Sequence, residues 1–379
     1  MKTYQIEPQA PLVFRSGKPF GEGSRDGANF PWPSSLAGLM RTVHWDAHHP
    51  TEVPTQASRN DLLQWASAGP FLAKREHGKL TPMFAKPADA LYLLKDEKND
   101  ANEKAVYRLL PGEYDSDCGS DLPQGIKPVV AEQGAPKAKP QDGPAYWTLE
   151  QLLAWRTGNA ISFPDRHSYH VEQRTHVAID CKTLAADAGR IFQTQGLDFS
   201  ARRKEKSGAQ PTRGFEKFDW VFLARSAVVA PSQMVTFGGE RRLSWLQLLA
   251  DANPLALPDA HRKTMQASRK VSLTLISPAL FIQGWQPNWP GNEVPGIPGL
   301  KLKLVSAAID RWLSISGWDL LKGQAKTARK AVAAGATYWF EIEGEPPADW
   351  AEKLWLAPVS DIEQDRRDGF GIVIPGIWK

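Results

Sequence analysis

The first forty-eight residues alternate between segments of different hydrophobic period. Thr3 to Phe14 alternates loosely and is rich in β-formers, which predicts a strand. Glycines and a proline between residues 16 and 27 then predict a loop. Apolar residues recur at helical spacing from 36 to 43, after the potential N-cap pair Ser34-Ser35. We therefore predict a strand, a glycine-rich loop and a helix from about Ser35 to Ala47.

The later part of the chain is rich in β-branched and aromatic runs. We predict strands in the segments 176–184, 189–199, 219–229, 271–281 and 336–344. Helical spacing favours helices at Thr148–Arg156, where Thr148 is the expected cap, and at Leu243–Ala250, Lys303–Leu313 and Ala348–Glu352. Helices and strands therefore mix without the regular alternation of a doubly wound sheet, which predicts an α+β fold.

Chain length and the distribution of prolines and glycines indicate how the chain is organised. With 379 residues, the chain exceeds the usual size of one hydrophobic core, so we expect two domains, with one large decorated domain as the alternative. The order strand, helix, strand, strand, helix, strand of ferredoxin-like units is compatible with both halves. Residues 95 to 145 combine charge with many prolines and glycines, and we interpret them as a surface insertion.

Composition narrows the function classes. The 46 basic and 42 acidic residues give a formal charge of +4, which only mildly favours an anionic partner such as nucleic acid. Cys118 and Cys181 form no CxxC pair, so we expect neither a disulfide framework nor a cysteine-based zinc site, and a reducing cytoplasm fits. No apolar run is long enough for a spanning helix, and no secretion signal is visible.

Several motifs together resemble one protein family. The stretch Pro11–Thr42 contains an Arg-x-Gly-x-Pro-Phe loop, a proline-rich turn and a Ser-x-Leu-Ala-Gly helix start. Further matching segments are GPFLAK at 69–74, residues 176–199, FGGERR at 237–242, and residues 317–341. These landmarks span nearly the whole chain. They resemble the third-subunit family of the type III-B CRISPR Cmr effector complexes, within the repeat-associated (RAMP) superfamily.

The resemblance implies a fold and a role. It implies two tandem ferredoxin-like domains of the RNA-recognition type, at 1–185 (with the insertion) and 186–379. The family role is to hold the 5′ handle of the CRISPR RNA and to dock on the large polymerase-like subunit, beside neighbouring backbone RAMP subunits, in antiviral defence. No reaction is attributed to the subunit, so the resemblance implies no cofactor, no catalytic residue and no metal site.

The glycine-rich loop is the first candidate RNA site. It carries Arg15, Lys18 and Arg25 among small residues, and its glycines allow the backbone to approach a phosphate closely. Spacing alone also fits a connecting loop whose glycines only permit the turn. The family resemblance favours the RNA-binding interpretation.

Other basic residues form smaller candidate groups. Lys322, Lys326, Arg329 and Lys330 would share one face if their segment were helical. Arg202, Arg203 and Lys204 lie on a predicted hairpin tip, which fits either an RNA-binding wedge or a solvated loop. The remaining candidates are Arg41 on the first helix, the period-two pair Arg174 and His176, and the pair Arg241 and Arg242 after two glycines.

Two other functions stay open at this stage. The first is a metal-independent repeat endoribonuclease of the same superfamily that uses His44, His167, His170 or His176 for proton transfer. His44 and His48 have zinc-compatible spacing, but no HExxH pattern or later ligand cluster completes a metal site. The second alternative is a protein that mainly bridges other subunits and contacts RNA little.

Overall fold

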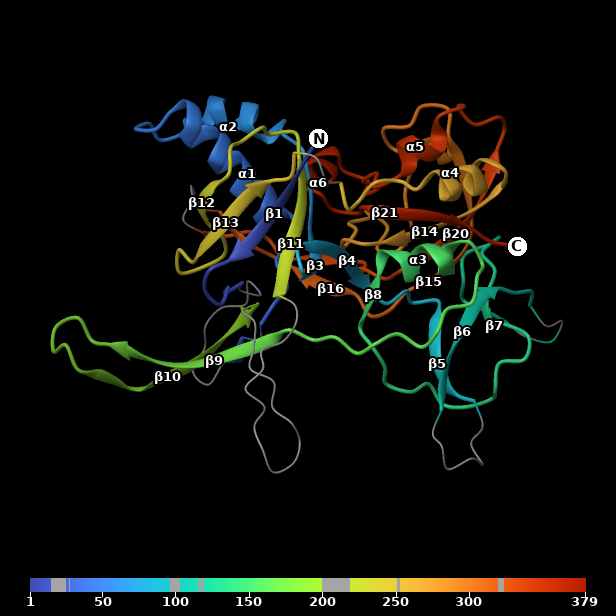
Figure 1. Cartoon of the computed structure of the whole chain (residues 1–379), viewed down its shortest axis with the longest axis horizontal. Coiled ribbons are helices and arrows are strands. Elements are labelled where there is room, and N and C mark those ends of the chain that lie inside the picture. Colours follow the sequence, from blue (N-terminus) through green and yellow to red (C-terminus); the bar gives the residue numbers. More distant parts are fainter. Residues whose placement is uncertain are drawn as a thin grey trace. The chain divides into compact units, whose positions relative to one another are not determined.

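The computed structural model describes residues 1–14, 25–26, 28–95, 103–114, 117, 119–199, 219–250, 253–319 and 324–379. Its helices accompany sheets that are largely antiparallel (Figure 1), which confirms the α+β class. In the part of the chain that is described, no helix is both long and apolar enough to cross a membrane.

The chain forms two compact units from alternating stretches of sequence. Unit 1 comprises residues 1–81, 168–254 and 314–330, and unit 2 comprises residues 82–167, 255–313 and 331–379. These units group residues by their contacts and do not test where consecutive ferredoxin-like domains would begin and end. The division after residue 185 therefore stays a prediction.

Unit 1 is built on strands that are hydrogen-bonded in the order β12-β13-β1-β11-β3 (Figure 1). Each neighbouring pair in this order is antiparallel: β12 with β13, β13 with β1, β1 with β11, and β11 with β3. Their bounds are β1 (Lys2–Pro8), β3 (Ser67–Glu76), β11 (Asp219–Ser226), β12 (Gln233–Thr236) and β13 (Leu243–Leu248). The other elements are β2 (Arg25–Asp26), α1 (Pro33–His48), α2 (Gln56–Leu63), β9 (His170–Ile179), β10 (Ala186–Asp198), β17 (Trp318–Asp319) and β18 (Gln324–Ala325).

The first helix confirms the helical period of residues 36 to 43. Leu36 and Met40 are fully buried in α1, which packs on β3. The predicted Ser34-Ser35 cap is wrong, because α1 begins at Pro33 and its N-cap residue Trp32 makes no side-chain capping bond. Proline suits this first position because the backbone N–H that it lacks would have no helical partner there.

The helix predicted at Leu243–Ala250 is wrong, because residues Leu243–Leu248 form strand β13. Ser244 and Leu246 are fully buried, whereas Leu243 is exposed. β13 pairs with β1 on one side and β12 on the other, and Ile6 lies opposite both Leu246 and Phe222. Pairing on both sides therefore decides a segment whose leucines also fit a helical period.

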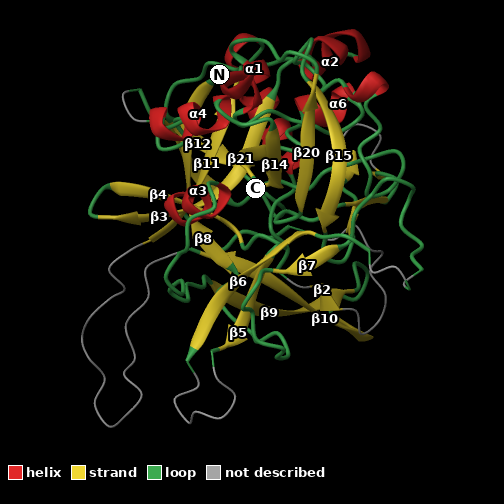
Figure 2. Ribbon diagram, turned by 90° about the vertical axis from the view of Figure 1, so that its right-hand side faces the viewer, coloured by secondary structure: helices red, strands yellow, loops and turns green. Residues whose placement is uncertain are grey.

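Unit 2 contains a second antiparallel sheet with the strand order β15-β20-β14-β21, whose strands lie side by side in Figure 2. The bounds are β14 (Lys270–Leu275), β15 (Lys301–Ala308), β20 (Thr337–Glu343) and β21 (Val373–Ile377). Three helices accompany it, α4 (Asp259–Gln266), α5 (Trp350–Leu354) and α6 (Glu363–Arg367), with a 3-10 turn, η1 (Pro290–Asn292). Short strands β16 (Leu313–Ile315) and β19 (Arg329–Ala331) pair where the two units' sequence ranges meet.

One predicted helix of unit 2 is wrong and another is confirmed. The segment Lys303–Leu313 is largely strand β15, in which exposed Lys301 and Lys303 alternate with buried Leu302. A period of two is typical of a strand with one covered face. The helix predicted at Ala348–Glu352 is present as α5.

The first part of unit 2 includes the predicted insertion. Its elements are β4 (Lys79–Ala85, which starts in unit 1), β5 (Ala90–Leu94), β6 (Lys104–Pro111), β7 (Val129–Ala131), β8 (Tyr146–Thr148) and α3 (Leu149–Arg156). α3 has the predicted cap, with a complete capping box between Thr148 and Gln151. The described part of the insertion packs on its unit, because Lys127 N donates to Val305 O at 2.7 Å and Ser306 Oγ donates to Lys127 O at 2.7 Å.

Candidate nucleic-acid interface

The two ends of the glycine-rich loop are held together in unit 1. On the entry side, the backbones of Leu12 and Leu197 exchange two hydrogen bonds of 2.8 and 2.9 Å. The side chain of Asn29, on the exit side, donates to Phe14 O at 3.0 Å. Ala28 N donates to the side chain of Gln195 at 3.1 Å. The base of the loop is therefore fixed, whereas Arg15 and Lys18 lie outside the described residues.

The exit of the loop joins a three-stranded sheet. β2 runs parallel to β10, with Arg25 opposite Gln193 and Asp26 opposite Thr194. β9 pairs with the other edge of β10, so that Arg174 lies opposite Thr194. Residues 25 and 174, which are far apart in sequence, thus lie on the two strands that flank β10 in one sheet. β9 and β10 continue as a long two-stranded ribbon away from the unit 1 sheet (Figure 1).

Arg174 and His176 lie on one side of β9, as their spacing predicts, and both side chains are partly exposed. Arg174 Nε lies 2.8 Å from a carboxylate oxygen of Glu172. The Nε2 atom of His176 is 2.7 Å from Thr194 Oγ1, and its ring stacks on Phe192 with centroids 5.1 Å apart. This face combines a cation, an imidazole and an aromatic ring, groups that contact phosphates, sugars and unpaired bases in RNA complexes.

A tight turn reaches the entry of the loop from the other side. Gly239 N donates to Val13 O at 2.7 Å. Gly238 has a φ of +85°, and a Cβ there would lie 2.9 Å from Val13 O, so a side chain does not fit without a shift. After these glycines, Arg241 is exposed, whereas Arg242 is paired with Glu240. The turn therefore carries an exposed arginine, Arg241, two residues after its backbone contact with Val13.

We call this region the loop-base surface. It consists of the backbone of Leu12–Phe14, the segments Arg25–Asp26 and Ala28–Asn29, the side chains of Arg174 and His176, and the turn Phe237–Arg242. Sequence reasoning missed Asn29 and Gln195, which fix the loop. No spacing signal identifies them, because the bond from Ala28 to Gln195 spans 167 residues.

Arg41 is placed differently from the other candidates. Its side chain is largely buried in α1, and its guanidinium donates to Leu63 O at 3.3 Å and Trp65 O at 3.1 Å. These bonds tie α1 to the last residue of α2 and to Trp65, which follows it. A phosphate could reach Arg41 only if these elements separated, so we leave this residue out of the proposed RNA contacts.

The remaining basic groups do not join the loop-base surface among the described contacts. Lys326, Arg329 and Lys330 lie in exposed, extended segments around β18 and β19, so they do not share a helical face. Lys326 N donates to Gly317 O at 2.8 Å, which closes a local hairpin. Lys322 and the trio Arg202, Arg203 and Lys204 lie outside the described residues.

The described contacts give His44 and His170, two histidines of the enzyme alternative, different partners. His44 contacts the ring of His48 and that of Trp65, and its pKa is lowered by burial and by the nearby His48 and His49. His170 Nδ1 lies 3.7 Å from a carboxylate oxygen of Asp198. Across the described ranges, no three His, Cys, Asp or Glu side chains are grouped as metal ligands.

Comparisons with known proteins give the family. A family model described as CRISPR-associated protein (Cas_Cmr3) matches residues 4–378. A chain from a cryo-EM structure of the Type III-B Cmr-beta bound to cognate target RNA matches with a TM-score of 0.49 and 14% identity. The match covers 98% of this chain and 96% of that chain. A chain from the same assembly bound to cognate target RNA and AMPPnP, state 1, has a TM-score of 0.46 and 14% identity, with coverages of 89% and 86%.

None of the curated proteins compared with the chain matches it. The assignment rests on the family model, which covers nearly the whole sequence and confirms the resemblance in the motifs. The chain belongs to the CRISPR-associated protein (Cas_Cmr3) family.

Proposed function

We propose that this chain is a non-catalytic, guide-binding subunit that holds the 5′ handle of a CRISPR RNA on the loop-base surface. The family is that of a type III-B Cmr effector subunit. In this proposal the chain docks on the large polymerase-like subunit and on neighbouring backbone RAMP subunits in the cytoplasm. The observation that carries the proposal is the meeting of the two ends of the glycine-rich loop with the β9–β10 ribbon and the Phe237–Arg242 turn.

The strand orders support the ferredoxin-like part of the proposal. In unit 1, the strands β1, β3, β11 and β13 follow each other in the chain and take the spatial order fourth, first, third, second. In unit 2, β14, β15, β20 and β21 take the same order. α1 lies between the first two strands of the first set, and α5 and α6 lie between the last two of the second. We propose that each set is one ferredoxin-like domain with a shortened helical layer.

The physical basis is electrostatic attraction together with close backbone approach. Exposed cations such as Arg241 neutralise phosphates and release counterions, which makes binding depend on salt. Glycine-rich backbone with free N–H groups accommodates a bent sugar-phosphate chain. The partly exposed rings of His176 and Phe192 offer a face on which an unpaired base can stack.

The test compares two matched double variants in the assembled complex. Arg174→Ala with Arg241→Ala removes two cations from the loop-base surface, and Lys301→Ala with Lys303→Ala removes two exposed cations from β15. We expect the first pair to lower retention of the guide RNA through a salt wash by up to about tenfold, at about 1 kcal/mol or less per contact, with the smaller share from Arg174 because it is paired with Glu172. The second pair should leave retention unchanged, and adding Arg15→Ala and Lys18→Ala should deepen the loss.

Handle recognition needs a separate experiment. Guides that carry the handle should bind more tightly than guides with a random sequence in its place, and the first double variant should reduce this preference. Equal retention by both double variants, or equal binding of both guides, would contradict the proposal. A third variant, Lys326→Ala with Arg329→Ala and Lys330→Ala, measures whether the β18–β19 segment contributes to the same contact.

One observation favours testing the enzyme alternative as well. His170 and Asp198 form a pair in which a carboxylate can orient an imidazole for proton transfer. The isolated chain should be incubated with precursor RNA in EDTA, beside the variant His170→Ala. Specific cleavage that disappears in the variant would replace the non-catalytic proposal with this one.

A further inference from the structure

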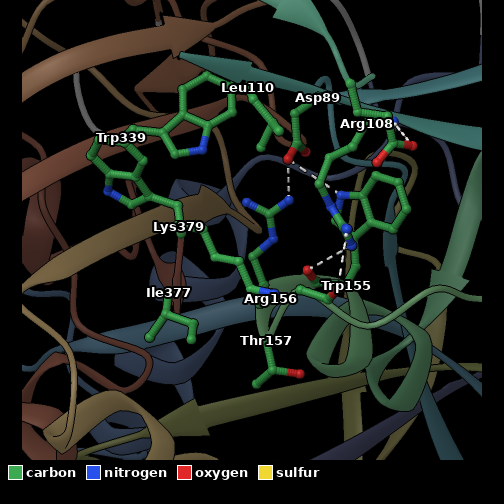
Figure 3. A pocket seen from close by; sticks show the side chains of 12 residues that line it. Asp89, Arg108, Leu110, Trp155, Arg156, Thr157, Trp339, Ile377 and Lys379 are labelled. Atoms are coloured by element: carbon green, nitrogen blue, oxygen red, sulfur yellow. Dashed lines mark hydrogen bonds and ion pairs between the residues drawn. The ribbon is translucent and has the colours of Figure 1, made fainter. Parts of the chain in front are cut away.

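Unit 2 contains a cavity of about 240 Å³ at the C-terminal end of α3 (Figure 3). Its polar side is formed by Asp89, Arg108 and Arg156. Its apolar side includes Trp339 and Ile377. All of the residues that line it belong to unit 2. The cavity therefore belongs to a single compact body and is separate from the loop-base surface.

Arg156 is held in the cavity wall by one carboxylate. Its side chain is 3% exposed, and its Nη2 donates to Asp89 Oδ2. Asp89 also accepts from Trp155 Nε1 at 3.3 Å and from Thr337 Oγ1 at 3.2 Å, so the carboxylate is fixed from three directions. The buried guanidinium cannot swing out to solvent without abandoning Asp89.

Arg156 keeps donors that the described residues do not use. A guanidinium carries five N–H groups in a rigid planar fork. Asp89 is its one side-chain hydrogen-bond acceptor among the described residues, and Nε is buried with no acceptor at all. Buried donors are normally paired in folded proteins. A nearly enclosed, under-satisfied guanidinium beside a cavity is therefore an observation that points to a ligand.

Arg108, the second guanidinium of the wall, is already engaged. It lies over the ring of Trp155 at 3.7 Å from the centroid and donates to Trp155 O at 3.1 Å and to Asn159 O at 2.9 Å. Burial, followed by the nearby charge of Arg156, lowers its pKa. Arg156 is thus the guanidinium that has donors to offer.

The charge balance selects the kind of acceptor. Asp89 and Glu132 lie in the wall together with Arg108 and Arg156, and the exposed Lys379 is at the rim. Two acids close to two arginines disfavour a doubly charged phosphate, whereas a neutral carbonyl oxygen or ring nitrogen meets no such repulsion. Apart from Thr157 and Gly158, the rest of the wall is apolar and includes indole rings, which suit a flat ring system.

We propose that this cavity binds a single carbonyl-bearing nucleobase, and guanine above all. Guanine presents O6 and N7 as two adjacent acceptors that match the fork of an arginine, whereas adenine presents a donor in place of O6. The volume is below the range of drug-sized pockets, which suits one base rather than a larger ligand. The base belongs either to a free nucleotide or to an unpaired RNA strand, and the inference does not rest on handle binding.

The first test uses free nucleosides and the full-length chain. Guanosine and adenosine are titrated by calorimetry, and we expect guanosine to bind at least tenfold more tightly. Ile377→Trp fills the cavity but keeps Arg156 and Asp89, so it should abolish guanosine binding. Ile282→Trp places the same residue at a position in unit 2 that is 68% exposed and should leave binding unchanged.

The second test separates the two sources of the base. Single-stranded RNA oligomers with one guanine, 7-deazaguanine or adenine are compared with free guanosine as competitors. If the guanine oligomer competes best, the site takes a base of RNA; if free guanosine alone binds, it takes a nucleotide. Equal binding of guanosine and adenosine, no saturable binding of either guanine probe, or binding that survives Ile377→Trp would overturn the proposal. Circular dichroism spectra and melting temperatures must match between the two tryptophan variants.

The tests also separate this inference from handle binding. Arg174→Ala with Arg241→Ala should leave guanosine binding unchanged, because neither residue lines the cavity. Loss of guide retention in that variant together with intact guanosine binding supports two independent sites. A guanosine affinity that falls in the loop-base variant places the nucleoside on the loop-base surface and contradicts the cavity assignment.

Discussion

The two candidate regions use arginine in opposite ways. In the cavity of unit 2, Arg156 is 3% exposed and depends on Asp89, which is 2% exposed. On the loop-base surface of unit 1, Arg241 is exposed and has no ion pair with a described residue. Removing a guanidinium from water is costly unless a fixed partner compensates its charge. The buried arginine is therefore part of the fold, whereas the exposed one remains available to an outside phosphate.

The largest expected effect follows from breaking the buried pair. Asp89→Ala leaves Arg156 as an uncompensated buried charge, so we expect the free energy of unfolding to fall by about 3–5 kcal/mol. The double variant Asp89→Leu with Arg156→Met replaces both ions by apolar groups and should recover most of that loss. Urea unfolding of the full chain measures both. A loss below about 1 kcal/mol for Asp89→Ala would show that the pair is not buried as described.

An exposed arginine should change binding rather than stability. We expect Arg241→Gln to reduce the slope of log affinity against log salt by about 0.7, the contribution of one phosphate of a single strand. Arg242→Gln should change it less, because Arg242 is paired with Glu240. Binding of handle RNA by the complex between low and moderate KCl measures the slopes. Equal slopes for the two variants and the unmodified chain would remove Arg241 from the proposed contact.

Local signals in the sequence predict part of this fold. The helical period identifies α1, and the cap of α3 is visible as Thr148 followed by Gln151 three residues later. The sequence pattern favours helices at β13 and β15, because their leucines occur at spacings compatible with both periods. Their pairing partners lie far away in the chain and decide the outcome, and a local pattern does not contain this information.

The candidate sites show the same limit. Glycines followed by arginines identify the loop and the Gly238–Arg242 turn from sequence, because glycine conformation is a local property. Sequence patterns do not identify the cavity, because Asp89 and Arg156 are 67 residues apart and the apolar side comes from β20 and the C-terminal residues 377–379. Burial converts Arg156 from one basic residue among 46 into a candidate ligand donor.

A third arginine, Arg75, is intermediate in exposure between Arg156 and Arg241, and its ion pair gives the smallest expected effect. Arg75 is 25% exposed and donates to both carboxylate oxygens of Glu7, at 2.6 and 2.9 Å, and to Asp219 at 2.9 Å. The hydrogen bonds from Arg75 lower the pKa of Glu7 despite partial burial. The folded state therefore favours the ionised carboxylate. Its contribution to stability is present above the pKa of an unfolded glutamate, about 4.3, and is lost as pH falls through the lower folded value.

Glu7→Gln tests this prediction. Because the group is about one-third exposed, we expect the variant to be less stable than the unmodified chain by at most about 1 kcal/mol between pH 5 and 7. The difference should shrink as pH falls below the unfolded value and through the lower folded pKa, because the carboxyl is then protonated in both states. Melting temperatures across this range measure it, with Glu345→Gln as the control because Glu345 is 96% exposed. A difference that does not depend on pH would mean that the loss arises from packing. Arg75 would then resemble the buried Arg156 and would not be intermediate between Arg156 and Arg241.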